Sequence, residues 1–147
     1  MAGVSDGTGD PFDLHRFVDA QTGVYGTVVD ELRAGRKRSH WMWFVFPQLR
    51  GLGRSPTAVR FSISSLDEAR AYLAHDVLGP RLRECTRLVA AIDGRTAEEI
   101  FGWPDDMKLR SSMTLFARAA DDNADFVDVL EKFYGGEEDP ATLTRLS

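Results

Sequence analysis

Apolar residues recur at helical spacing along most of this chain, and capping signals or glycines separate one series from the next. The first series follows Asp10–Pro11, an N-cap residue with proline at the first helical position, and runs from Leu14 to Leu32 before Gly35. A stripe repeating every three or four residues over this length is typical of an amphipathic helix. This pattern excludes most folds except those built from packed helices.

The same signals continue towards the C-terminus. Ser65 and Thr96 each stand three residues before a glutamate, which is the pattern of a capping box. Gly79–Pro80, Pro104–Asp105 and Asp139–Pro140 open further helices. We therefore predict an all-α, single-domain multihelical bundle of about six helices. Of the 147 residues, 10–147 would form this domain and the Gly/Asp-rich segment 1–9 a disordered N-terminal tail.

The segment His40–Pro47 departs from the helical pattern. It is almost wholly apolar and holds four of the chain's aromatic residues. Its aromatic content is compatible with a short strand, but no second strong strand lies nearby to pair with it. Because an exposed segment of this kind would promote aggregation, we predict a buried short helix or an extended segment that crosses the core.

The charged residues are segregated. Lys and Arg number 18 against 23 Asp and Glu, for a net charge of −5, yet the stretch from Arg33 to Arg60 contains no acidic residue. Such a basic stretch in an acidic protein favours a small anionic ligand, and nucleic acid is an unlikely partner because nucleic-acid domains carry a broad basic face. Alternatively, Arg36–Arg38 follows a helix C-terminus, where the helix dipole favours cations.

Several functional classes are excluded. A single cysteine, Cys85, allows no internal disulfide, and no apolar run is long enough to span a membrane or to form a signal peptide. We therefore expect a cytoplasmic protein. Its histidines, His15, His40 and His75, lack metal-ligand spacing, so we predict no metal site and no cofactor. The sequence does not determine the oligomeric state.

The first candidate site is the aromatic segment with its flanks. Aromatic rings stack on bases, while arginine side chains and backbone N–H groups hold phosphates. The candidate ligand-binding residues here are Arg38, His40, Trp41, Trp43 and Gln48. The alternative is that the aromatic residues simply fill the core and that the Gly51–Pro56 loop is solvated.

Two further candidates lie elsewhere. Gln21 occupies the apolar stripe of the first helix, so its amide needs a partner, either a backbone group or a ligand. Lys108, Ser111 and Ser112 share one face of a later helix and would line a cleft, with Asp105 as a base or as an acceptor for a sugar hydroxyl. Alternatively, Asp105 caps that helix and Lys108 is an exposed surface lysine.

Particular strings along the chain match one bacterial family. The most specific are His40–Gln48 and Ser111–Phe116, and shorter ones are Ala20–Gln21, Gly35–Lys37, Gly51–Gly53, Tyr72–Leu73, Leu78–Gly79, Ile100–Gly102, Pro104–Asp106 and Lys108–Leu109. On these strings, the chain resembles the bacterial family called domain of unknown function 1810, sometimes labelled calpastatin-like. The resemblance implies a compact all-helical protein with no assigned activity. The calpastatin label does not fit, because calpastatin-type inhibitors are disordered repeat chains.

A second, fainter resemblance is to the NADAR (YbiA-like) helical proteins, N-glycosidases that act on ribosylated or ADP-ribosylated bases. Ala20–Gln21 is similar to their Ala-Gln pair, and Pro104–Asp105, Lys108, Met113 and Phe116 are similar to their later motif. This resemblance implies a related fold and a nucleotide-like substrate.

Two functions of different classes follow from the sequence. The first is a binder of a nucleotide or an ADP-ribose-like ligand, with Asp105 and Lys108 as catalytic residues if the protein is an N-glycosidase. The second is a non-enzymatic interaction module that docks an acidic protein partner through the basic stretch 33–60. The sequence alone leaves open whether the protein is an enzyme.

Overall fold

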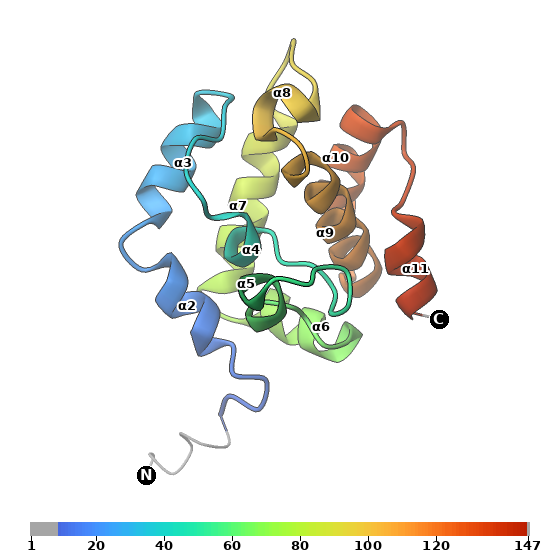
Figure 1. Cartoon of the computed structure of the whole chain (residues 1–147). Helices are drawn as coiled ribbons and strands as arrows, with labels where there is room; N and C mark the ends of the chain where they lie inside the picture. Colours follow the sequence, from blue (N-terminus) through green and yellow to red (C-terminus); the bar gives the residue numbers. More distant parts are fainter. Residues whose placement is uncertain (1–8, 147) are drawn as a thin grey trace.

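The predicted all-α class is confirmed by the computed structural model, which describes residues 9–146 (Figure 1). Residues 1–8 of the predicted tail lie outside the described residues. The described part of the chain contains ten helices: α2 (His15–Gln21), α3 (Tyr25–Arg33), α4 (Met42–Val45), α5 (Pro56–Arg60), α6 (Leu66–Ala74), α7 (Leu78–Ala90), α8 (Ala97–Phe101), α9 (Asp105–Ala119), α10 (Ala124–Tyr134) and α11 (Pro140–Leu146).

This number corrects the prediction of about six helices, and the first stripe shows why. The chain leaves α2 in an extended conformation at Thr22 and turns through Gly23, whose φ of 83° is in the left-handed region. Because the interruption is short, the apolar residues of α2 and α3 keep their helical spacing across it. Periodicity alone therefore predicts one long helix where the backbone forms two.

Predicted caps account for three of the helix starts, those of α6, α8 and α11. Thr96 and Glu99 form both hydrogen bonds of a capping box, and Asp139 accepts the N–H of the third residue of α11. Asp10 accepts the N–H groups of Leu14 and His15. However, α2 begins only at His15, after a turn, and not directly after Asp10. Local side-chain chemistry thus determines where these helices can begin.

The core lies where α10 and α6 each pack against both α7 and α9, with α8 and α11 also against α9 (Figure 1). Phe116 of α9 lies at the centre of this contact, with its ring 5.4 Å from Tyr72 of α6 and 6.0 Å from Phe126 of α10. The helices α2 and α3 lie along one side, and α11 lies on the other (Figure 1). The long helix α9 is therefore the element around which the others are arranged.

The aromatic segment forms the short helix α4 and is buried, as predicted. Trp41 is 2% exposed, and its ring lies 6.2 Å from Phe46 and 6.4 Å from Phe101. Within the described residues, the only strand-like pairing is an isolated bridge between Leu49 and Ile63. The segment therefore fills the core and does not pair as a strand.

A buried carboxylate, Glu31, holds the chain between α3 and α4. Its Oε1 accepts the backbone N–H groups of Arg38 (2.7 Å) and Ser39 (3.0 Å) and the indole N–H of Trp41 (2.9 Å), while Oε2 accepts the hydroxyl of Ser39 (2.5 Å). Burial alone would raise the pKa of Glu31, but these hydrogen bonds outweigh it and lower the pKa to about 2. No sequence motif indicates this role of Glu31.

We predict that Glu31→Gln lowers the free energy of unfolding at neutral pH by about 2–3 kcal/mol, because an amide nitrogen would face donors that now meet a carboxylate. The folded pKa lies below the ordinary value of 4.5, so the charged form stabilises the fold above that value. This contribution is lost as the pH falls towards about 2. Denaturant unfolding across this range measures it.

The matched control is Asp30→Asn, which changes the neighbouring exposed carboxylate and should leave the unfolding free energy nearly unchanged. The difference between the wild type and Glu31→Gln should shrink on acidification. A difference that stays constant down to the lowest pH would contradict the proposed role of the Glu31 charge.

Candidate functional site

Three charged side chains meet at the start of α9. The Asp105 carboxylate lies 2.9 Å from the ammonium of Lys37 and 3.3 Å from that of Lys108. Lys108 is on α9 itself, one turn after Asp105, whereas Lys37 belongs to the chain that leaves α3. The N–H of Lys37 donates to the carbonyl of Ile100 in α8, at 2.7 Å, and this bond brings the two segments together.

Two indole rings border this cluster. The ammonium of Lys37 lies 5.3 Å from the ring centre of Trp41, and that of Lys108 lies 5.0 Å from the ring centre of Trp43. The Trp41 ring is buried, whereas Trp43 on α4 is only half-buried. We call Lys37, Trp43, Asp105 and Lys108 the lysine–indole site.

The three charged side chains differ in solvent exposure, and this determines which charge a ligand could reach. The side chain of Lys37 is 7% exposed, that of Asp105 is 19% exposed and that of Lys108 is 24% exposed. Lys37 is closer to Asp105 than Lys108 is, and it is more buried. Lys37 therefore provides most of the charge that balances the Asp105 carboxylate. Two ammonium groups on one carboxylate leave a net positive charge, which is most accessible at Lys108.

This cluster contains two of the few lysines of the chain. Only three of its 18 basic residues are lysines, and two of them lie on this one carboxylate. The third, Lys132, bonds Asp93 and the carbonyl of Ala90 elsewhere. Lys37 was not among the predicted site residues, although its position in the acid-free stretch and the scarcity of lysine are signals that could have identified it.

The structure brings together four of the residues that the sequence analysis selected: Trp41, Trp43, Asp105 and Lys108. Trp41 needs a correction, because its ring is sealed in the core and its N–H is bonded to Glu31, so it has no face free for a ligand. The alternative role of Asp105 as a helix cap is also wrong. Its side chain makes no capping bond, and the N-cap position is occupied by Pro104.

Gln21 lies apart from this site, and its amide is used within the protein. Its nitrogen donates to the carbonyl of Phe44 (2.8 Å) and to the hydroxyl of Tyr72 (3.3 Å), while its oxygen accepts from Arg81 (3.2 Å). These contacts satisfy a buried amide without a ligand. The structure thus favours the structural alternative for Gln21.

Ser111 and Ser112 are buried on α9 and do not line a cleft. The hydroxyl of Ser111 lies 3.0 Å from a carboxylate oxygen of Asp139 and 3.2 Å from the carbonyl of Met107. The hydroxyl of Ser112 is fully buried and has no hydrogen-bond partner among the described residues. The prediction that these serines face a ligand is therefore wrong, because both side chains are buried.

Arg38, His40 and Gln48 do not join the lysine–indole site. The backbone N–H of Arg38 is held by Glu31, but its side chain is exposed, as is that of His40. Gln48 is half-buried, and its carbonyl accepts the N–H of Ile63 at 2.8 Å. Arg38 precedes the aromatic segment in the sequence, His40 begins it and Gln48 follows it.

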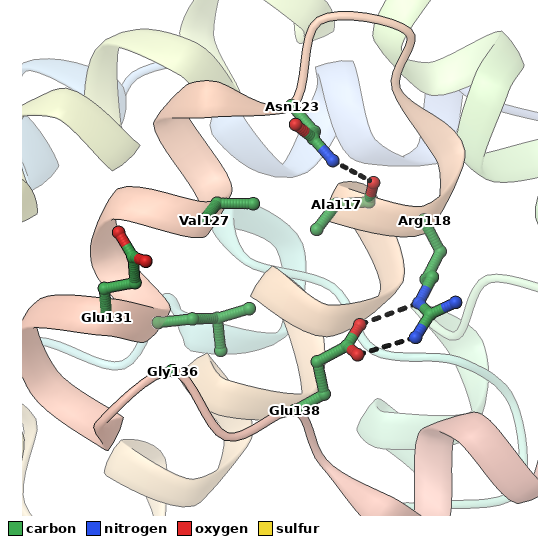
Figure 2. A pocket seen from close by; sticks show the side chains of 8 residues that line it. Ala117, Arg118, Asn123, Val127, Glu131, Gly136 and Glu138 are labelled. Carbon is green, nitrogen blue, oxygen red and sulfur yellow. Dashed lines mark hydrogen bonds and ion pairs between the residues drawn. The ribbon is translucent and has the colours of Figure 1, made fainter.

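A hollow of about 370 Å³ lies between α9, α10 and the chain leading to α11 (Figure 2). Arg118 holds Glu138 through two hydrogen bonds of 2.6 and 2.7 Å, and Asn123 donates to the carbonyl of Ala117 at 3.1 Å. The Arg118 guanidinium lowers the pKa of Glu138. The two charges neutralise each other, and none of the predicted site residues lines this hollow.

Among residues 9–146, no group of three or more His, Cys, Asp or Glu side chains is arranged to hold a metal ion. No helix in this part of the chain combines the length and the apolar character that crossing a membrane requires.

The family described as protein of unknown function DUF1810 matches residues 11–146. The chain belongs to this family. The crystal structure of the conserved hypothetical protein Rv1873 from Mycobacterium tuberculosis is similar to this DUF1810 chain, with 71% identity, a TM-score of 0.92, and coverage of 93% of this chain and 98% of that one. No curated protein matches. The NADAR resemblance and the calpastatin label are not supported.

We predict that Asp105→Asn lowers the free energy of unfolding by about 2 kcal/mol, because it leaves the buried ammonium of Lys37 without a counter-charge. The double variant Lys37→Met with Asp105→Asn should lose less than Asp105→Asn alone, since the unpaired charge is removed with its partner. Denaturant unfolding of the single and double variants measures the coupling.

The control for Asp105→Asn is Asp121→Asn, which changes an exposed carboxylate in the loop after α9 and should have little effect. If Lys37→Met made Asp105→Asn worse, or if the two effects simply added, the proposed dependence of Lys37 on Asp105 would be wrong.

Proposed function

We propose that the lysine–indole site binds a small anionic ligand of the nucleotide class, with a phosphate on Lys108 and a planar ring against Trp43. The observation that carries the proposal is the pairing of two ammonium groups with one carboxylate beside a half-buried indole. Lysine binds phosphate as a point charge, and indole faces stack on bases.

The position of Lys108 suggests how binding would proceed. In the free protein, its ammonium lies over the Trp43 ring and 3.3 Å from Asp105. A phosphate would draw this ammonium away from the ring and leave the indole face for the base. Asp105 stays neutralised by Lys37 during this exchange, so it would not repel the phosphate. Lys37 and Asp105 are therefore positioning residues in this proposal.

The same charges argue for binding over cleavage of an N-glycosidic bond. A glycosidase stabilises an oxocarbenium-like cation with a carboxylate. Here two ammonium groups lie within 3.3 Å of the only carboxylate in the site, so a developing cation would be repelled. We therefore assign Lys108 to ligand binding and Asp105 to positioning, and we expect no base release from NAD or ADP-ribose.

The test is calorimetric titration with AMP, ADP-ribose and NAD, with tryptophan fluorescence as a second readout. We expect saturable binding by at least one of these nucleotides and a change in Trp43 emission. Lys108→Gln and Trp43→Leu should each weaken binding about tenfold, because each removes one of the two contacts.

Lys132→Gln is the matched control, since it removes the lysine that lies outside the site and should leave affinity unchanged. Absence of saturable binding at millimolar nucleotide would contradict the proposal. Equal effects of Lys108→Gln and Lys132→Gln would also contradict it.

An acidic protein partner remains the second candidate, and one observation favours it. The side chains of Arg36, Arg38 and Arg54 are exposed and make no ion pair within the described part of the chain, and Trp103 is 75% exposed. Polyglutamate that binds in a salt-sensitive manner, together with a lack of nucleotide binding, would support docking of an acidic partner instead.

A further inference from the structure

A second basic feature lies away from the lysine–indole site, where the loop after α4 meets the start of α6 and the end of α11. These segments enclose a hollow of about 440 Å³. Its lining residues are Leu49, Arg50, Ser64, Ser65, Leu66, Arg145 and Leu146. We call it the Arg50–Arg145 hollow. Arg50 belongs to the acid-free stretch, whereas Arg145 comes from the last helix.

The backbone at Gly51 is shaped to admit Arg145. A Cβ atom built on Gly51 would lie 2.4 Å from Cζ and from one terminal nitrogen of the Arg145 guanidinium. The φ of Gly51, 98°, is also one that other residues rarely adopt. The guanidinium therefore packs directly on the loop that carries Arg50, so that two like charges border the same hollow.

No acidic side chain lines this hollow. The terminal nitrogens of Arg50 and the guanidinium of Arg145 make no hydrogen bond within residues 9–146, and only Nε of Arg50 approaches Ser62, at 3.5 Å. A neighbouring hollow shares Arg50 but is also lined by Asp13 and Glu68, and Glu68 is paired with Arg16 at 2.8 Å. Of these two hollows, only the Arg50–Arg145 hollow has no acidic residue among its lining residues.

The other residues that line the Arg50–Arg145 hollow supply both a hydroxyl group and apolar surface. Ser65 accepts the N–H of Glu68 at 3.2 Å, which leaves its own hydroxyl hydrogen free to donate. Leu49, Leu66 and Leu146 supply apolar surface to the same hollow. Two guanidinium groups and a hydroxyl beside leucine side chains suit a ligand that is anionic at one end and apolar at the other.

We propose that the Arg50–Arg145 hollow binds a small amphipathic anion: a carboxylate or phosphate group carried on a short apolar body. The anionic group would lie between the two guanidinium groups and accept from the hydroxyl of Ser65. The apolar body would lie against the three leucines. This site is separate from the lysine–indole site and does not depend on nucleotide binding there.

The test is titration of the ¹⁵N-labelled protein with phenyl phosphate and with benzoate, followed by amide NMR. We expect saturable shifts at Gly51, Ser65 and Leu66 with at least one of the two, and their relative affinities distinguish a phosphate from a carboxylate. Inorganic phosphate should bind about tenfold more weakly, because it buries no apolar surface, and neutral benzyl alcohol should give no saturable shift.

Arg50→Gln and Arg145→Gln should each weaken binding of the preferred probe about tenfold, while Arg54→Gln, which changes an exposed arginine of the same loop, should not. Gly51→Ala keeps both charges but displaces the Arg145 guanidinium, so it should also weaken binding. Lys108→Gln should leave these affinities unchanged, which separates this proposal from the previous one.

Three results would overturn the proposal. The first is the absence of saturable shifts at the hollow with both aromatic anions at millimolar concentration. The second is equal binding of inorganic phosphate and the aromatic anions, which would remove the role of the leucines. The third is an equal loss of affinity in Arg54→Gln and Arg50→Gln, which would reduce the effect to general surface charge.

Discussion

The hydrogen bonds to the Glu31 carboxylate determine the path of the chain between α3 and α4. They hold the backbone at Arg38 and Ser39 and the indole of Trp41, so that the aromatic segment enters the core in one orientation. These donors favour the charged form of the buried carboxylate. Lys37 lies in the chain that follows α3, immediately before Arg38, the first residue that Glu31 holds. Its position over Asp105 therefore depends on Glu31 as much as on α9.

The acid-free stretch contributes to two separate places on the molecule. At its start, Lys37 pairs with Asp105 and leaves Lys108 with unbalanced charge. Further along, Arg50 meets Arg145 from the last helix in a hollow without acidic residues. In both cases, the partner lies far away in the sequence. The short helix α4 separates these two positions along the chain.

Much of the fold could be predicted because its signals are local. The capping box at Thr96, the cap at Asp139 and the burial of the aromatic segment each follow from neighbouring residues. The interruption at Gly23 could not, because α2 and α3 stay in phase across it. The candidate site was only partly predictable. Trp43, Asp105 and Lys108 were selected, but the contact between Lys37 and Asp105 joins distant segments and has no local signal.

A crystal structure of the protein grown with AMP would test nucleotide binding at the lysine–indole site most directly. The account predicts that the phosphate lies within hydrogen-bonding distance of Nζ of Lys108, that the adenine ring lies against Trp43, and that Lys37 remains on Asp105. A nucleotide bound elsewhere would contradict this proposal. So would crystals grown with AMP in which no nucleotide is bound and Lys108 still lies over the indole ring of Trp43.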